Sequence, residues 1–581
     1  MMRSDPSGEG DTLGAVAAIL SHRSFVALAL VLWTIAFVSS PWWLTPGGDD
    51  GFYLYQVISF LRDGTFAVPF FDDWHRVYSN LPGYPAAQGT FFAVWTTLGL
   101  PFDVYTHRAF QIVCASALVF VGAALVRRAA LEQTANSAGG RLAVGLFLVI
   151  LGVTPFPLDV LFMRPEALGT LLAVTALFAF AKGWPALDAR WVTLAGVALG
   201  GSMTTHPTFV VASGVTAAAF GAVLLWRRAW RSLAVAIITA LVPLALMVSY
   251  YVFGGATAWD EIVHHIAIRR PSPGGAVVYG LGELIWNAVA QPSPATLFLA
   301  IPFVVLVGLI LVAAALLSVR LVRAARTRVW PFGPAELAVH AFFLGNLVNL
   351  VLDSSGKVQI FTPTGFAAAL SVAALVAPGE ARAGVRRTTH GTGGRKAMQA
   401  MALAAGVLCV GYVPASHVLK RMLLSTPRFS HQVALAQVVA TAPPGQLVLG
   451  SGDRFLMPFA ERMMTEALSG ATPSTALVFP HTIMFWDELA LGYATDLACR
   501  LHTNGAADVL WGVERLFVRS LDREGGRAVF FIPDGPVDVA IDFRIAQIPY
   551  EFADGLYLRG TVEGLTVTTR DGGQRLATGA C

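Results

Sequence analysis

Long apolar stretches without charged residues recur along the first 416 residues of the chain. A helix that crosses the hydrocarbon core of a bilayer needs about 17–25 such residues. The pattern therefore predicts transmembrane helices within the following stretches: Ser24–Ser40, Ala109–Leu125, Leu142–Leu158, Ala167–Ala181, Trp191–Trp226, Ser232–Ala258, Ala295–Val319, Leu337–Leu352, Val358–Pro378 and Ala397–Ser416.

The stretch Trp191–Trp226 is long enough for two spans. It is interrupted at Thr204-Thr205-His206-Pro207, where proline removes a backbone donor and ends a helix. We interpret His206 as a packed, hydrogen-bonded residue of this break rather than as a ligand. Counted in this way, the chain is a polytopic α-helical membrane protein with about 11 transmembrane helices.

The pattern changes after residue 416, where charges become frequent and the apolar runs become short. Such a segment is typical of a separate α/β domain. Strands are expected at Gln446–Leu449, Ala528–Ile532, Val537–Ile541 and Leu565–Thr568, and helices at Arg428–Ala440 and Phe485–Leu497. The predicted organisation is an N-terminal tail (1–23), a transmembrane domain (24–416) whose first external loop is 41–103, and a C-terminal α/β domain (417–581).

Composition supports the membrane assignment. Charged residues make up 13% of the 581 residues, hydrophobic residues make up 55%, and the mean hydropathy is +0.62. An average soluble protein is about one-quarter charged. An ordinary soluble enzyme is therefore excluded, and so is a disordered chain, which needs low hydrophobicity and high charge.

Arginine clusters predict the orientation, because cytoplasmic loops carry the excess of basic residues. With eleven spans, all of these clusters lie on the side of the N-terminus. They are Arg127-Arg128, Arg227 to Arg231, Arg320 to Arg328, and Arg382 to Lys396. The loop 41–103 and the C-terminal domain then lie outside. The bias toward arginine and alanine suggests a GC-rich bacterium, and the expected location is the bacterial plasma (inner) membrane. The polar N-terminal tail is unlike a cleavable signal peptide, so the first span is expected to be a retained anchor.

Cysteine is scarce. Two of the four cysteines, Cys499 and Cys581, fall in the C-terminal domain and could pair in an oxidising compartment. Their pairing requires a close approach of the two Cα atoms that the sequence does not establish.

The first external loop carries the most distinctive pattern. Asp49 and Asp50 follow the first span and are flanked by glycines that allow a tight turn. An amphipathic helix at Phe52–Leu61 and a second helix at Ala87–Thr97 are expected to lie along the membrane interface. The two carboxylates could be solvated loop residues or a helix cap. Their place at the interface also suits chemistry on a lipid-linked substrate.

In this arrangement the chain resembles the GT-C glycosyltransferases, above all the branch of the protein mannosyltransferases and lipid A aminoarabinose transferases. Members carry an acidic pair, two interfacial helices and a span that opens with arginine, as Asp49-Asp50 and His107-Arg108 do here. Arg164 and Glu166 match an Arg-x-Asp pattern of the second external loop, with Glu in place of Asp. Lys357, with its following aromatic and proline, matches a late motif.

Two features separate the chain from other branches. The run Asp49-Asp50-Gly-x-Tyr is also similar to the arabinofuranosyltransferases of the same superfamily, so the donor sugar stays open. The Trp-Trp-Asp signature of the oligosaccharyltransferases is absent from the sequence, which argues against transfer of a whole oligosaccharide.

The resemblance implies a transfer of sugar from a polyprenyl-phosphate donor to a glycan, lipid or protein acceptor, with inversion at the anomeric carbon. An inverting transferase needs a carboxylate that takes the acceptor proton. We assign this role to Asp49, with Asp50 assisting. The leaving phosphate needs cations, and the residues expected to bind the donor phosphate or substrate are Arg164, Glu166, Lys357, Arg108, His264 and Arg269.

Each of these assignments has a structural alternative. Arg164 could pair with Glu166 without touching substrate, and Lys357 could be an interfacial anchor. His264 and His265 show no third ligand for a metal. Phosphate is a good leaving group, so no metal is required, although the acidic pair could bind Mg or Mn.

Two other classes of function fit a polytopic chain of this kind. A transporter or flippase would move its substrate through the bilayer, and a non-catalytic cell-envelope assembly protein would act through its C-terminal domain. The expected partners are the lipid-linked donor, its acceptor and the bilayer. Nucleic acid is not among them, because no basic patch with interleaved aromatic residues occurs.

Overall fold

The computed structural model of the chain describes residues 16–43, 48–64, 66, 81–103, 105–134, 137–154, 156, 160–184, 186–253, 294–327, 332–352, 361–384, 447–451, 453–470, 476–479, 508–514, 518–522, 527–531, 537–545, 550–552, 555–569 and 574–576. The chain divides into two compact units. The helical unit comprises Met1–Leu44, Ser79–Tyr84 and Ala109–Leu424, and the sheet unit comprises Thr45–Tyr78, Pro85–Arg108 and Ser425–Cys581.

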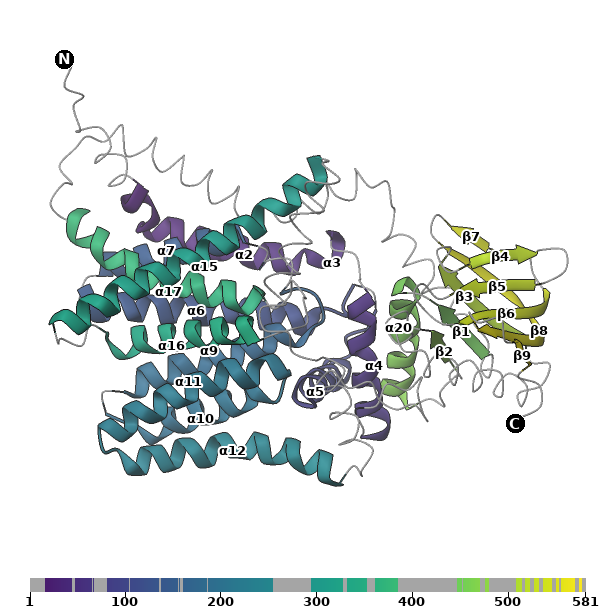
Figure 1. Cartoon of the computed structure of the whole chain (residues 1–581), viewed down its shortest axis with the longest axis horizontal. Helices are drawn as coiled ribbons and strands as arrows, with labels where there is room; N and C mark the ends of the chain where they lie inside the picture. The colour runs from purple at the N-terminus through teal and green to yellow at the C-terminus, as the bar shows by residue number, and fades with distance from the viewer. Residues whose placement is uncertain are drawn as a thin grey trace, which may run out of the picture. The chain divides into compact units, whose positions relative to one another are not determined.

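The helical unit is built from long apolar helices (Figure 1). They are α2 (Arg23–Val38), α6 (Ala109–Thr134), α7 (Ser137–Gly152), α9 (Pro165–Gly183), α10 (Ala189–Met203), α11 (Pro207–Trp226), α12 (Trp230–Phe253), α15 (Pro294–Thr327), α16 (Pro334–Leu352) and α17 (Phe361–Gly384), with the short α3 (Ser40–Trp43) after α2. Among the described residues, six of the helices are long and apolar enough to cross a membrane. The predicted polytopic α-helical fold is confirmed.

Each predicted span up to Val358–Pro378 overlaps one of these helices. The last predicted span, Ala397–Ser416, lies outside the described residues. The number of spans therefore stays a prediction.

The predicted helix break inside Trp191–Trp226 is found immediately before Pro207. α10 ends at Met203 and α11 begins at Pro207, which occupies the first helical turn and needs no backbone donor there. The Nδ1 atom of His206 accepts a hydrogen bond from the backbone N–H of Thr208 at 3.4 Å. His206 therefore caps the start of α11, which agrees with its interpretation as a hydrogen-bonded residue of the break.

Small residues bring neighbouring helices of this unit close together. α12 packs along α10 (Figure 1). Gly196 and Gly200 of α10 face Thr239 and Ala240 of α12 so closely that an added Cβ would collide with them. Glycine at this interface lets the two backbones approach, as in many membrane helix pairs.

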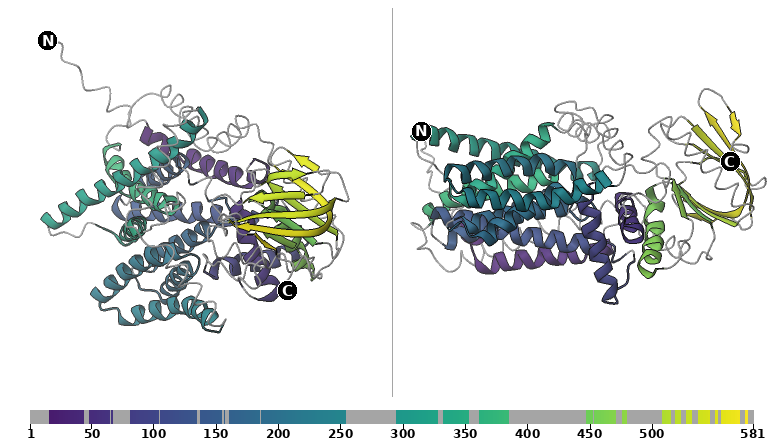
Figure 2. Two further views of the ribbon diagram at one scale, coloured as in Figure 1. Left: turned by 45° about the vertical axis from the view of Figure 1, so that its right-hand side comes forward. Right: turned by 90° about the horizontal axis from the view of Figure 1, so that it is seen from below.

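The sheet unit contains one sheet of nine strands, seen as a curved layer in Figure 2. Its main order is β2-β1-β3-β8-β6-β5-β4, and β7 and β9 also pair with β8. The strands are β1 (Leu447–Ser451), β2 (Ala476–Phe479), β3 (Asp508–Glu514), β4 (Val518–Asp522), β5 (Arg527–Phe531), β6 (Val537–Ile545), β7 (Tyr550–Phe552), β8 (Gly555–Thr569) and β9 (Gln574–Leu576).

The first part of the sheet is parallel and the rest is antiparallel. β1 pairs in parallel with β2 and β3, and the helix α20 (Asp453–Ser469) makes the crossover from β1 to β2. Each predicted strand overlaps a strand of the structure, whereas α20 was not expected from the sequence. The predicted helices Arg428–Ala440 and Phe485–Leu497 lie outside the described residues, as do Cys499 and Cys581.

Two helices come from the first external loop, α4 (Gly48–Asp63) and α5 (Gly83–Thr97). Both begin four residues before the predicted start, so Asp49 and Asp50 belong to the first turn of α4 rather than to a turn before it. Acidic residues are favoured there because the first N–H groups of a helix are unsatisfied and its dipole is positive at that end.

Candidate functional site

The acidic pair stands at the start of a helix that is buried over its middle. All of the residues Tyr53–Ser59 are buried. Burial raises the pKa of the Tyr55 phenol well above its ordinary value of 10.0, so Tyr55 stays neutral at physiological pH. The backbone of α4 thus holds Asp49 and Asp50 at the end of a firmly packed element.

Arg164 and Glu166 meet where α9 begins. Arg164 is the extended residue that precedes the helix, Pro165 opens the first turn, and Glu166 follows in that turn. The Arg164 Nη2 atom lies 2.8 Å from Glu166 Oε1, and Arg164 Nε donates to both carboxylate oxygens at 3.2 Å. Arg164 is 8% exposed and Glu166 is 6% exposed, so water does not screen this pair. The structure therefore contains the ion pair that the sequence left as an alternative.

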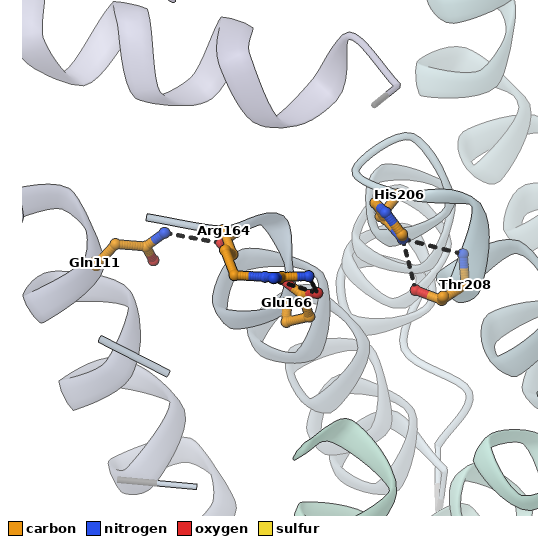
Figure 3. A network of polar contacts seen from close by, with 5 residues as sticks. All are labelled: Gln111, Arg164, Glu166, His206 and Thr208. Carbon is orange, nitrogen blue, oxygen red and sulfur yellow. Dashed lines mark hydrogen bonds and ion pairs between the residues drawn. The ribbon is translucent and has the colours of Figure 1, made fainter. Parts of the chain in front are cut away.

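Gln111 of α6 holds the main chain of Arg164 (Figure 3). Its Nε2 atom donates to the Arg164 carbonyl oxygen at 2.8 Å and to the Tyr84 hydroxyl at 2.7 Å. A carbonyl oxygen can only accept, so the amide nitrogen must face Arg164. Gln111 is fully buried. One glutamine side chain thereby joins the start of α5, the start of α6 and the loop before α9.

The break between α10 and α11 is linked to these residues through Gly83, which precedes Tyr84 in the chain. The backbone N–H of Gly83 donates to the Thr204 carbonyl oxygen at 3.0 Å. At the same break, His206 and Thr208 form a hydrogen-bonded pair (Figure 3). We call the connected residues the polar network: Gly83, Tyr84, Gln111, Arg164, Glu166 and Thr204.

Arg108 is fully buried and directly precedes α6. It belongs to the sheet unit, with His107 beside it in the chain, whereas Arg164 and Glu166 belong to the helical unit. Lys357, His264 and Arg269 lie outside the described residues. Of the residues predicted for the site, the structure brings Arg164 and Glu166 into contact.

A second buried charged cluster joins α15, α16 and α17. Arg320 Nη1 lies 2.6 Å from Glu336 Oε1, and His340 Nε2 lies 3.6 Å from the same oxygen. The other ring nitrogen of His340 lies 2.9 Å from the Ser371 hydroxyl. The Glu336 side chain is fully buried. Charges inside a membrane domain are costly unless paired, so this cluster fixes the three helices to one another.

The sequence interpretation missed Gln111 and Tyr84. A signal was available for Gln111, which stands in the first turn of an otherwise apolar stretch. In the part of the chain that the structure describes, no group of three His, Cys, Asp or Glu residues could hold a metal ion.

Comparison with known proteins places the fold. Neither a protein-family model nor a curated protein matches the sequence. Among solved structures, the chain is similar to ArnT from Cupriavidus metallidurans bound to undecaprenyl phosphate, with a TM-score of 0.52 and 13% identity over 92% of this chain and 97% of that chain. The same protein in the apo state gives a TM-score of 0.51 and 15% identity, with the same coverage. The similarity extends through both units.

Proposed function

We propose that this chain, which has the fold of the GT-C membrane glycosyltransferases, is itself an integral-membrane glycosyltransferase. It moves a sugar from a polyprenyl-phosphate donor to a glycan, lipid or protein acceptor. The reaction takes place on the extracytoplasmic face of a bacterial inner membrane and inverts the anomeric carbon.

The observation that carries this proposal is the extent of the structural similarity. It covers 92% of this chain and 97% of ArnT, whose structure holds undecaprenyl phosphate. A partial match could reflect a common arrangement of transmembrane helices. A match over nearly the whole of both chains extends beyond the transmembrane helices into the sheet unit.

The chemistry assigns one carboxylate to the acceptor. The acceptor oxygen attacks the anomeric carbon, its bond to that carbon forms, and the bond from the carbon to the phosphate oxygen breaks. The acceptor proton passes to Asp49, and the electron pair of the broken bond leaves with the polyprenyl phosphate. Asp50 assists by holding the donor sugar or the first turn of α4. A positioned base of this kind contributes roughly 10²–10⁴-fold to the rate.

Cations stabilise the charge that develops on the leaving phosphate. Arg164, Lys357 and Arg108 are the proposed contacts, and His264 and Arg269 are secondary ones. Glu166 orients the Arg164 guanidinium through the contact of 2.8 Å between their charged groups. A guanidinium held in this way is organised before the phosphate arrives, which lowers the cost of binding. Mg or Mn could bind at the acidic pair, and a comparison of transfer with and without a chelator measures that dependence.

Lipid analysis of a strain that lacks the gene tests the proposed function. Mass spectrometry of its lipid extract should show a polyprenyl-phosphate sugar that accumulates, and one glycan, lipid or protein should lack the same sugar. Both changes should revert when the wild-type gene is returned. Unchanged lipid-linked sugars together with lost flux of a solute would instead indicate a transporter.

A further inference from the structure

The helix that carries the acidic pair belongs to the same compact unit as the C-terminal sheet. α4 lies in the sheet unit with residues 425–581, while the transmembrane helices form the helical unit. Within the sheet unit, α4 packs along α20, the helix that joins β1 to β2. A segment of the first external loop and a segment of the C-terminal domain thus form one packed pair.

The position of α4 depends on its neighbours. The helix has 16 residues and contains Gly48 and Gly51, which favour helix poorly. Most of the stability of a helix in a protein comes from packing rather than from intrinsic helix propensity. The burial of every residue from Tyr53 to Ser59 shows that α4 has such neighbours on all sides.

Two neighbours within the sheet unit can be named. Gly89 of α5 lies against Phe60 and Val57 of α4, so closely that a Cβ at Gly89 would meet the Phe60 ring. α20 supplies the other contact. α5 comes from the same loop as α4, whereas α20 belongs to the C-terminal domain. Of these two neighbours, α20 therefore supports α4 from outside the loop.

α20 is suited to act as this support because it is fixed to the sheet. It contacts β1, β2 and β3, and it connects two strands that pair in parallel. Ala460, Met463 and Met464 are buried on it. The Arg462 Nε atom lies 2.9 Å from Glu466 Oε1, one turn along the helix. Because α20 is packed on the sheet, it offers a fixed surface to α4, which packs against it.

We propose that the C-terminal domain is a positioning domain for the acidic pair: α20 sets the place of α4 and, through it, of the Asp49 carboxylate. The inference rests on the proposed function of Asp49. It gives the C-terminal domain a role in the proposed reaction, and Met464, a buried residue of α20, is the position at which this role is tested.

The chemistry predicts which kinetic constant should respond. If α20 is loosened, α4 and the Asp49 carboxylate that it carries shift, and this carboxylate acts in the transition state. The proposed phosphate contacts, Arg164 and Lys357, come from another part of the chain, so donor binding should not change. Loss of an interaction made only in the transition state lowers kcat without raising KM. A misplacement of about 1 Å can cost on the order of 10²-fold in rate.

The test compares M464A with wild type in the full-length protein. Transfer is assayed with the lipid-linked sugar that accumulates in the deletion strain, and hydrogen exchange is followed by mass spectrometry over residues 48–63. M464A should lower kcat by about tenfold or more at unchanged donor KM, and exchange over α4 should be faster while α6 and α9 exchange as in wild type. M464L, which keeps the volume, should restore both.

The matched control is T465A, which changes the exposed neighbour on the same helix and should behave as wild type. If the M464A protein does not accumulate in the cell, the milder variant M464V should show the same changes in kcat and in hydrogen exchange over α4, with smaller magnitude. Wild-type kcat and wild-type exchange over α4 in folded M464A would overturn the proposal. Exchange over α4 needs no turnover, so it tests the positioning role even if the wild-type protein transfers no sugar and the proposed function fails.

Discussion

Arg164 and Glu166 form a buried ion pair in which the guanidinium contacts the carboxylate at 2.8 Å across the first turn of α9. Neither residue has appreciable access to water. Removing two charges from water is costly, and breaking such a pair leaves the remaining charge uncompensated. The pair is therefore a structural requirement as well as a proposed part of the substrate site.

This arrangement predicts unequal effects of single and double substitution. E166A should lower the free energy of unfolding by about 3–5 kcal/mol, because Arg164 stays buried without its carboxylate. The double variant R164A/E166A should be more stable than E166A alone. Thermal unfolding in detergent measures both, and a double variant less stable than E166A would show that the pair does not couple.

The contact between Gln111 and Arg164 predicts a dependence of activity on a residue that carries no charge. Q111L keeps the approximate volume and removes the two donated hydrogen bonds, each worth about 1 kcal/mol to stability. Transfer should fall by about 10-fold or more, since the backbone of Arg164 is released. In an R164A background the same substitution should change transfer little. Equal effects in both backgrounds would mean that Gln111 acts independently of Arg164.

Gly83 predicts a steric effect at the junction of α5 with the α10–α11 break. A Cβ at residue 83 would lie 2.7 Å from the Thr204 carbonyl oxygen and would also meet the Thr204 hydroxyl. G83A should therefore cost about 1–3 kcal/mol of stability, as overpacking does. The matched control is G214A in α11, where an added Cβ has no neighbour within 4 Å and alanine favours helix. Equal melting temperatures of the two variants would contradict the close approach.

The Arg320–Glu336 contact predicts a loss of stability far along the chain from the acidic pair. R320A leaves the fully buried Glu336 carboxylate without its guanidinium and should destabilise the protein by about 3–5 kcal/mol. The exposed Arg323, one turn further along α15, provides the control R323A, which should melt within about 0.5 kcal/mol of wild type. Similar melting of both variants would show that the cluster does not hold α15.

Hydropathy was sufficient to predict the helices of the helical unit, because the membrane demands an apolar stretch of fixed length wherever the chain crosses it. Pro207 likewise placed the α10–α11 break. The start of α4 was predicted too late because the glycines around Asp49 and Asp50 were interpreted as a turn. α20 was missed because its apolar residues stand among charged ones.

The contacts between helices could not be predicted in the same way. Arg164 and Glu166 are two residues apart, so their pairing was foreseeable as an alternative. Gln111 and Arg164 are 53 residues apart, and no property of either residue indicates that the other is its partner. The fold brings them together through the packing of α6 against α9.

Returning D49N to the deletion strain tests whether Asp49 takes the proton of the acceptor hydroxyl. The matched control is D63N, which changes the acidic residue at the other end of α4. The polyprenyl-phosphate sugar should accumulate with D49N as it does in the absence of the gene, although the protein is present in the membrane at the wild-type level. The D63N strain should contain wild-type amounts of this lipid. Normal levels of the lipid-linked sugar and a complete glycan in the D49N strain would contradict the role of Asp49 as the base.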